Sequence, residues 1–106
     1  MDFEREWARL QGAVAVTVGL LESCGEMEWA GILVGRLARV DAYGGNGLDS
    51  VLSLFGGMGS FNDLVLHPLN GHLVEPDALA EVNERLEFLR EEILESATAL
   101  RAGLVE

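Results

Sequence analysis

The chain has little positive charge. Its 106 residues include seven arginines, no lysine and 18 acidic residues, which gives a formal net charge of −11 at pH 7. Proteins that bind nucleic acid neutralise phosphates with a basic surface, and an anionic membrane attracts the same kind of surface. The composition therefore excludes nucleic acid and anionic membranes as expected partners. If the chain has a partner, its charge favours a basic protein.

Cysteine is nearly absent as well. Cys24 is the only one, so no internal disulfide can form, and no neighbouring base is there to activate the thiol. We interpret it as a small core residue. Residues 1–10 carry acids where a secretion signal needs bases, and the longest apolar run, residues 12–21, is well below the roughly 20 residues that span a bilayer. We therefore expect a cytoplasmic protein.

No linker divides the sequence, and 49% of its residues are hydrophobic. This share of apolar residues excludes a disordered chain in spite of the charge. A chain of this length buries about two-thirds of its unfolded surface and folds unaided. Residues 1–106 are therefore expected to form one domain.

Helical periodicity is what the sequence contains instead. Apolar residues recur at steps of three and four in three long segments, which predicts an all-α fold. The three helices are expected over residues 2–25, 26–43 and 76–103. The apolar stripe of the last helix consists of Leu79, Val82, Leu86, Leu89, Ile93, Ala97 and Leu100.

Local signals predict where the later helices begin and end. Asn46 and Asp49 have the spacing of a capping box and predict a short fourth helix over residues 48–55. Pro76 suits the first turn of the long helix, and Gly103 suits a left-handed cap at its end. The sequence thus predicts a bundle of about four helices.

The first two helices contain many small residues. The middle of the first, residues 12–21, is apolar all round, which predicts an inner helix covered on more than one side. Small side chains would let the two helices pack closely as an antiparallel pair, although genome composition would also explain their number. These residues are Gly12, Ala15, Gly19, Ala30, Gly31 and Gly35.

The stretch from Leu54 to His67 does not follow the helical period. Three glycines interrupt an apolar run, which predicts backbone at positive φ or a close approach to another group. Ser60 and Asp63 have capping-box spacing and predict a helical turn after the glycines. We expect four apolar side chains to anchor the turn in the core: Met58, Phe61, Leu64 and Leu66.

This glycine turn is a candidate binding site. Its backbone amides are able to form a nest for an anion or for a partner's carboxylate. The string lacks the lysine and spacing of a phosphate-binding loop and does not match the dinucleotide fingerprint. A purely structural turn is the favoured interpretation, because glycine clusters mostly serve turn geometry.

Residues 64–67 and 72–74 flank a Pro-Leu-Asn-Gly sequence, which predicts either a small, irregular β-hairpin or a turn before the long helix. His67 and His72 would meet across this hairpin, and with Asp63 they form the only conceivable metal cluster. Their spacing is not that of a zinc site, and no nucleophile with a positioned base accompanies them. We therefore predict no metal, no cofactor and no catalytic residue.

The run FGGMGSFNDLVL resembles a family of small, uncharacterised bacterial proteins, often actinobacterial, with a GGMGS-[Phe or Leu]-Asn-Asp-Leu motif. The resemblance implies a short, mostly helical protein and covers most of the chain, but it implies no catalytic residue. Some such families lie among bacterial toxin and immunity genes. The residues that match the motif are Gly56, Gly57, Met58, Gly59, Ser60, Asn62 and Asp63.

The outer face of the long helix carries most of its acids and few arginines, a pattern usually typical of a solvated face. From this face we expect a non-enzymatic protein-binding module, such as an immunity-type inhibitor of a basic bacterial toxin. The alternative is a structural protein that forms a homodimer through Phe88 and Leu94, and a weaker one is an anion site at the Gly57 to Asp63 turn. The candidate binding residues are Gly57, Met58, Gly59, Ser60, Asn62, Asp63, Glu84, Glu87, Glu91 and Glu95.

The stripe of the long helix gives a first testable prediction. Leu86→Ala and Leu89→Ala should each lower the free energy of unfolding by about 2 to 5 kcal/mol, because each leaves a core cavity. Thermal or denaturant melts measure this loss. Two neutral variants would mean that the opposite face of the helix is turned inward.

Overall fold

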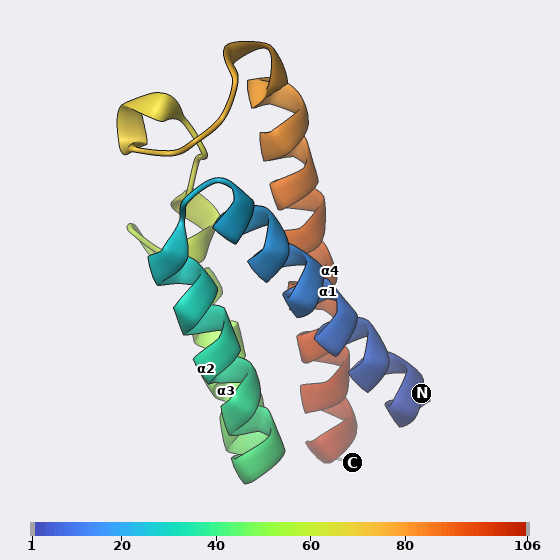
Figure 1. Ribbon diagram of the computed structural model, residues 1–106. Coiled ribbons are helices and arrows are strands. Elements are labelled where there is room, and N and C mark those ends of the chain that lie inside the picture. The colour runs from blue at the N-terminus through green and yellow to red at the C-terminus, as the bar shows by residue number, and fades with distance from the viewer. Residues whose placement is uncertain (1, 106) are drawn as a thin grey trace.

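The computed structural model describes residues 2–105, and over these residues it is all-α, as predicted (Figure 1). Short 3-10 turns, and no strand, connect the last two of its four α-helices within the described part of the chain. No helix among residues 2–105 has the length and apolar character needed to cross a membrane. The helices are α1 (Phe3–Ser23), α2 (Met27–Tyr43), α3 (Gly45–Leu52) and α4 (Leu79–Val105).

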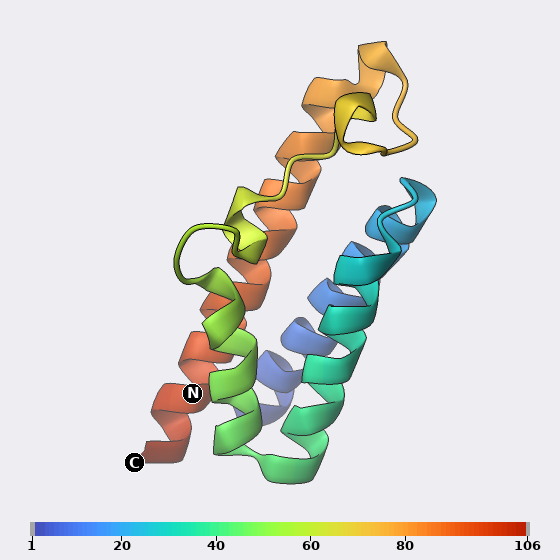
Figure 2. The ribbon, with the colours of Figure 1, turned by 90° about the vertical axis from the view of Figure 1, so that its left-hand side faces the viewer.

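The helices form an elongated bundle of 46 × 21 × 21 Å. α1 and α2 run in opposite directions, as predicted, and α3 returns alongside α2 (Figures 1 and 2). α4 packs against both α1 and α3 and, at 27 residues, extends for roughly 40 Å. The N-terminal and C-terminal ends lie at the same end of the molecule (Figure 1).

The first two helices begin at residues that the sequence marks. The carboxylate of Asp2 accepts a hydrogen bond of 3.1 Å from the amide of Arg5, and that of Glu26 accepts one of 3.1 Å from the amide of Trp29. These bonds satisfy amides that a helix leaves free in its first turn. Between the helices Gly25 has φ +76°, a conformation that glycine adopts without steric cost.

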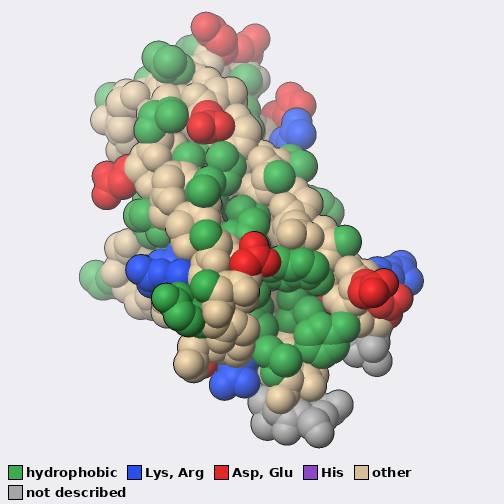
Figure 3. Space-filling view, turned by 60° about the horizontal axis from the view of Figure 1, so that its bottom comes forward, with side chains coloured by type: hydrophobic (Ala, Val, Ile, Leu, Met, Phe, Trp, Pro, Cys, Tyr) green, Lys and Arg blue, Asp and Glu red, His purple; other side chains and the backbone are tan. Residues whose placement is uncertain are grey.

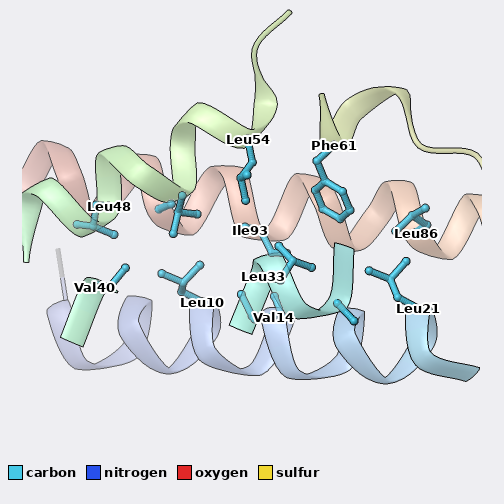
Figure 4. Close-up of a cluster of buried hydrophobic side chains, with 14 of the residues drawn as sticks. Leu10, Val14, Leu21, Leu33, Val40, Leu48, Leu54, Phe61, Leu86 and Ile93 are labelled. Carbon is cyan, nitrogen blue, oxygen red and sulfur yellow. The ribbon is translucent and has the colours of Figure 1, made fainter. Parts of the chain in front are cut away.

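The core lies between α1, α2 and α4 and is closed by α3 (Figure 4). The predicted stripe of α4 is confirmed, because Leu86, Ile93 and Ala97 are fully buried and Leu89 is 7% exposed. Cys24 is also buried, as expected of a core residue. Each large side chain buried in this way contributes about 1.5–3 kcal/mol of hydrophobic free energy.

Two predicted helix ends are wrong. α3 begins at Gly45 after a cap residue, Gly44, that offers no side chain, and Asp49 is instead bonded to the guanidinium of Arg101 at 2.8 Å. An ion pair with α4 thus takes the carboxylate that would have closed a capping box. Gly103 does not end α4, which continues to Val105.

Of the two structures expected for residues 64–74, the β-hairpin is wrong and a turn is present. The segment forms 3-10 turns at Pro68–Asn70 and Pro76–Ala78, and Gly71 ends the first at φ +84°. The side-chain amide of Asn83 on α4 pairs with both the N–H (2.8 Å) and the C=O (2.9 Å) of Leu66. The backbone of Leu66 is therefore bonded to a helix and is not free to join a ladder.

The glycines of α1 and α2 do not bring these two helices together. A Cβ placed on Gly12, Gly19, Gly31 or Gly35 would meet no atom within 4 Å outside its own helix backbone. The close approach lies at Gly47 on α3 instead, where a Cβ would lie 2.5 Å from the Cα of Val40 on α2. Glycine is required there because any side chain would overlap the backbone of α2.

This difference predicts opposite effects for two glycine substitutions. Gly47→Ala should lower the free energy of unfolding by about 1–3 kcal/mol, because the methyl group forces α3 away from α2. Gly35→Ala, in the exposed middle of α2, should raise it by about 0.5–1 kcal/mol, because alanine favours the helix. Denaturant melts of both variants test the pair, and a stabilising Gly47→Ala would contradict the packing of α3.

Candidate functional site

The glycine turn projects from the bundle between the 3-10 turn Ser53–Phe55, which follows α3, and the 3-10 turn Phe61–Asp63. Gly57 and Gly59 have φ +82° and +75°, as predicted for a turn that needs glycine, whereas Gly56 is extended. Met58 at the tip is 96% exposed, so the prediction that it anchors the turn is wrong. It is too far out between the two left-handed glycines to reach the core.

The predicted capping box at Ser60 and Asp63 is wrong for the serine. No side-chain bond caps the 3-10 turn Phe61–Asp63, and the Ser60 hydroxyl is buried without a hydrogen-bond partner among residues 2–105. The Asp63 carboxylate does reach back, but it accepts from the amide of Gly59 at 2.7 Å. The chain's own carboxylate therefore occupies an amide that an external anion would need.

Phe61 holds the turn against the bundle. Its side chain is fully buried and points into the core cluster (Figure 4). The ring lies 5.2 Å from that of Trp29 on α2 and 5.8 Å, edge-on, from that of Phe55, both centroid to centroid. Asn62 adds a hydrogen bond of 2.9 Å from its amide nitrogen to the carbonyl of Phe55.

Arg90 ties the same turn to α4. One guanidinium nitrogen donates to the carbonyls of Phe61 (2.9 Å) and Leu64 (2.8 Å), and the group lies 5.8 Å from the centroid of the Phe61 ring. Burial lowers the pKa of Arg90, while the charges of Glu87 and Asp63 act in the opposite direction. The two carbonyls that end the turn are thus satisfied by one long side chain.

A hollow of about 290 Å³ lies where the turn meets α4. It brings together residues from both predicted surfaces: Asn62 of the turn, and Glu87 and Glu91 of the acidic face. The sequence analysis did not assign Phe55 or Arg90 to a site, and it placed Leu94 only on the alternative homodimer surface. Arg90 follows Leu86 by four residues, so helical spacing alone would have placed its side chain beside the buried stripe.

The acidic face of α4 is divided. Glu84, Glu87 and Glu91 are exposed, and none has an arginine or histidine nitrogen within 4.0 Å among residues 2–105. Glu95 instead contacts Arg9 of α1 at 2.6 Å. We therefore call Glu84, Glu87 and Glu91 the acidic stripe, and Glu95 is not part of it.

Arg9 also contacts Glu92 at 2.6 Å. The hydrogen bond from Arg9 lowers the pKa of Glu92, and the bonds from both carboxylates raise that of Arg9. These ion pairs join α1 to α4.

The two histidines form hydrogen bonds within the segment that joins α3 to α4 and from this segment to Glu26. The Nδ1 atom of buried His72 accepts from the amide of His67 at 3.0 Å, and its Nε2 atom lies 3.0 Å from a carboxylate oxygen of Glu26. Burial acts to raise the pKa of Glu26, but bonds from His72 and the Trp29 amide lower it on balance. No group of three or more His, Cys, Asp or Glu residues among 2–105 is placed to hold a metal ion.

A second hollow, of about 240 Å³, lies at the end of the bundle where the two termini meet. Figure 3 shows hydrophobic side chains gathered on this end. Two of the residues at its rim, Phe3 and Leu104, are 42% and 47% exposed. The sequence analysis did not identify this hollow, because its residues come from α1, α2, α3 and α4.

Residues 22–75 match the model of a family described as a domain of unknown function, DUF6966. The chain belongs to this family. The DUF6966 match runs from the end of α1 to the residue before Pro76, so it includes the glycine turn and leaves α4 outside. It agrees with the resemblance to an uncharacterised family. No curated protein and no solved structure matches the chain.

The role of Arg90 is testable. Arg90→Met keeps the aliphatic stem but leaves the Leu64 carbonyl without a donor and the Phe61 carbonyl with only the 3.3 Å bond from the Leu64 amide, so the free energy of unfolding should fall by about 1–3 kcal/mol. Hydrogen exchange should also speed up at the amides of Asp63 and Leu64, which bond within the turn. Arg85→Met is the matched control, because Arg85 is exposed on the same helix. Equal effects of the two variants would contradict the account of Arg90.

Proposed function

We propose that the protein is a non-enzymatic binding module that recognises a basic protein partner. The observation that carries the proposal is the acidic stripe, whose three exposed carboxylates have no cation within 4.0 Å among the described residues and which borders a formed hollow. Carboxylates without an internal partner are free to pair with a partner's arginine or lysine. α4 fixes their spacing, so little ordering is needed on binding.

An immunity-type inhibitor of a basic bacterial toxin would use such a surface. Toxins that act on nucleic acid are basic where they bind phosphates, so an acidic inhibitor is attracted to that surface from a distance. The net charge of −11 supports fast, salt-dependent association. We propose no catalytic residue. Cys24 is buried, and its one hydrogen-bond contact among residues 2–105 is with the Ser23 hydroxyl at 3.9 Å. Both histidines are bonded to the chain.

The turn itself is a weaker candidate for binding an anion. The Gly59 amide already donates to the Asp63 carboxylate, and the hollow beside the turn contains two more carboxylates. These charges would repel an anion. In this proposal the turn contributes one wall of the protein-binding surface.

Self-association is a second candidate, and the apolar hollow at the end of the bundle favours it. Phe3 and Leu104 at its rim would be buried by a second copy, giving a homodimer. The dimer surface predicted on α4 is less suitable for pairing two copies, because Phe88 and Leu94 lie about 120° apart around the helix. Leu94 belongs to the other hollow.

The test of the proposed function uses partners captured from the source organism. Replacing Glu84, Glu87 and Glu91 together with glutamine should slow association, because steering is lost, and should leave the melting temperature unchanged, because solvated charges contribute little to stability. Replacing Glu4, Glu22 and Glu28 on α1 and α2 changes the net charge by the same amount and should slow association less. Surface plasmon resonance at several salt concentrations measures both.

Two outcomes would contradict the proposal. Equal slowing by the two triple variants would mean that only the net charge matters and not the acidic stripe. A mass that doubles with concentration, abolished by Phe3→Glu and unaffected by the triple variants, would favour the homodimer.

A further inference from the structure

We infer that the hollow between the glycine turn and α4 receives one arginine side chain of the basic partner. This inference rests on the proposed function and adds the chemistry of the group that enters the site. It depends on the size of the hollow, on the types of atom that line it and on the way its own arginine is used.

The size of the hollow fits a single side chain. At about 290 Å³ it lies at the lower limit of the roughly 300–1,000 Å³ that small-molecule sites occupy. A drug-sized ligand or a cofactor would not be enclosed in it. One long side chain with its terminal group fits within it.

The hollow is lined by two apolar and four polar or charged residues. Phe55 is half-buried and Leu94 is 36% exposed, so both have surface left for an aliphatic stem or a flat group. Glu87 and Glu91 supply two carboxylates. The amide nitrogen of Asn62 donates to the carbonyl of Phe55, and no hydrogen bond to its side-chain oxygen is present among residues 2–105. The rim therefore offers acceptors from Glu87, Glu91 and Asn62, next to the remaining N–H donors of Arg90.

Arg90 does not make the hollow basic. It donates to two backbone carbonyls at 2.9 and 2.8 Å, and with two glutamates beside it the lining keeps a net charge of −1. An incoming cation is attracted and an anion is not. Among cations, a guanidinium suits the site better than an ammonium, because it is flat, stacks on an aromatic ring and donates to two carboxylates at once.

Two synthetic peptides, hexa-arginine and hexa-lysine, test this inference. With wild-type protein at 150 mM salt, hexa-arginine should bind about two- to fivefold more tightly than hexa-lysine, the gain expected of a stacked guanidinium. Isothermal titration calorimetry measures the affinities. Nuclear magnetic resonance titration should place the largest arginine-specific shifts at Asn62 and Leu94.

Two matched substitutions locate the effect. Glu91→Gln in the hollow should remove the preference for arginine, whereas Glu84→Gln, outside it on the same helix, should weaken both peptides alike and keep the preference. Phe55→Leu should also remove the preference, and a melt of this variant shows whether it is folded. If it is not folded, the comparison of the two glutamate variants decides.

The outcomes separate the inference from the proposed function. Equal binding of the two peptides, weakened alike by Glu84→Gln and Glu91→Gln, would overturn the arginine site and leave the acidic stripe as the binding surface. Failure of wild-type protein to bind either peptide, even at 50 mM salt, would overturn both.

Discussion

The burial of Phe61 is the contact on which the surface of this protein depends. The residues between α3 and α4 have no helix or strand to hold them, yet one aromatic ring joins them to three helical elements. It packs against Trp29 of α2, against Phe55 in the 3-10 turn that follows α3, and under the guanidinium of Arg90 on α4. Full burial of such a side chain contributes about 1.5–3 kcal/mol. Without this contact, residues 56–64 would be held against α4 only weakly, and the hollow would lose the side that the turn forms.

The backbone of this segment is then satisfied by side chains of other elements. Arg90 donates to the carbonyls of Phe61 and Leu64. Asn83 accepts from the amide of Leu66 and donates to its carbonyl. These bonds satisfy backbone N–H and C=O groups that neighbouring strands would satisfy in a hairpin. Because both donors lie on α4, the glycine turn and the acidic stripe have a fixed relation to each other, which is what a preformed binding surface requires.

Much of the fold could be predicted from the sequence, since the apolar period of α1, α2 and α4 is local information. The site could be predicted only in part. Glu91 and Glu95 are four residues apart on the same face of α4, so the sequence does not distinguish them. Glu95 is paired because Arg9, 86 residues away in the chain, lies beside it. The Asn-Gly signal for a hairpin failed because Asn83 competes for the backbone of Leu66. The close approach at Gly47 depends on the path of α3, which no periodicity encodes.

The rigidity of the turn is the central claim, and the backbone order parameters of Phe61, Asn62 and Asp63 test it most directly. Nitrogen-15 relaxation of the free protein should give these amides values of about 0.85, equal to those in the middle of α4, because Phe61 and Arg90 fix them before any partner binds. Gly57 and Gly59, at the exposed tip, serve as the internal comparison. Values below about 0.6 at Phe61 to Asp63 would contradict a preformed surface.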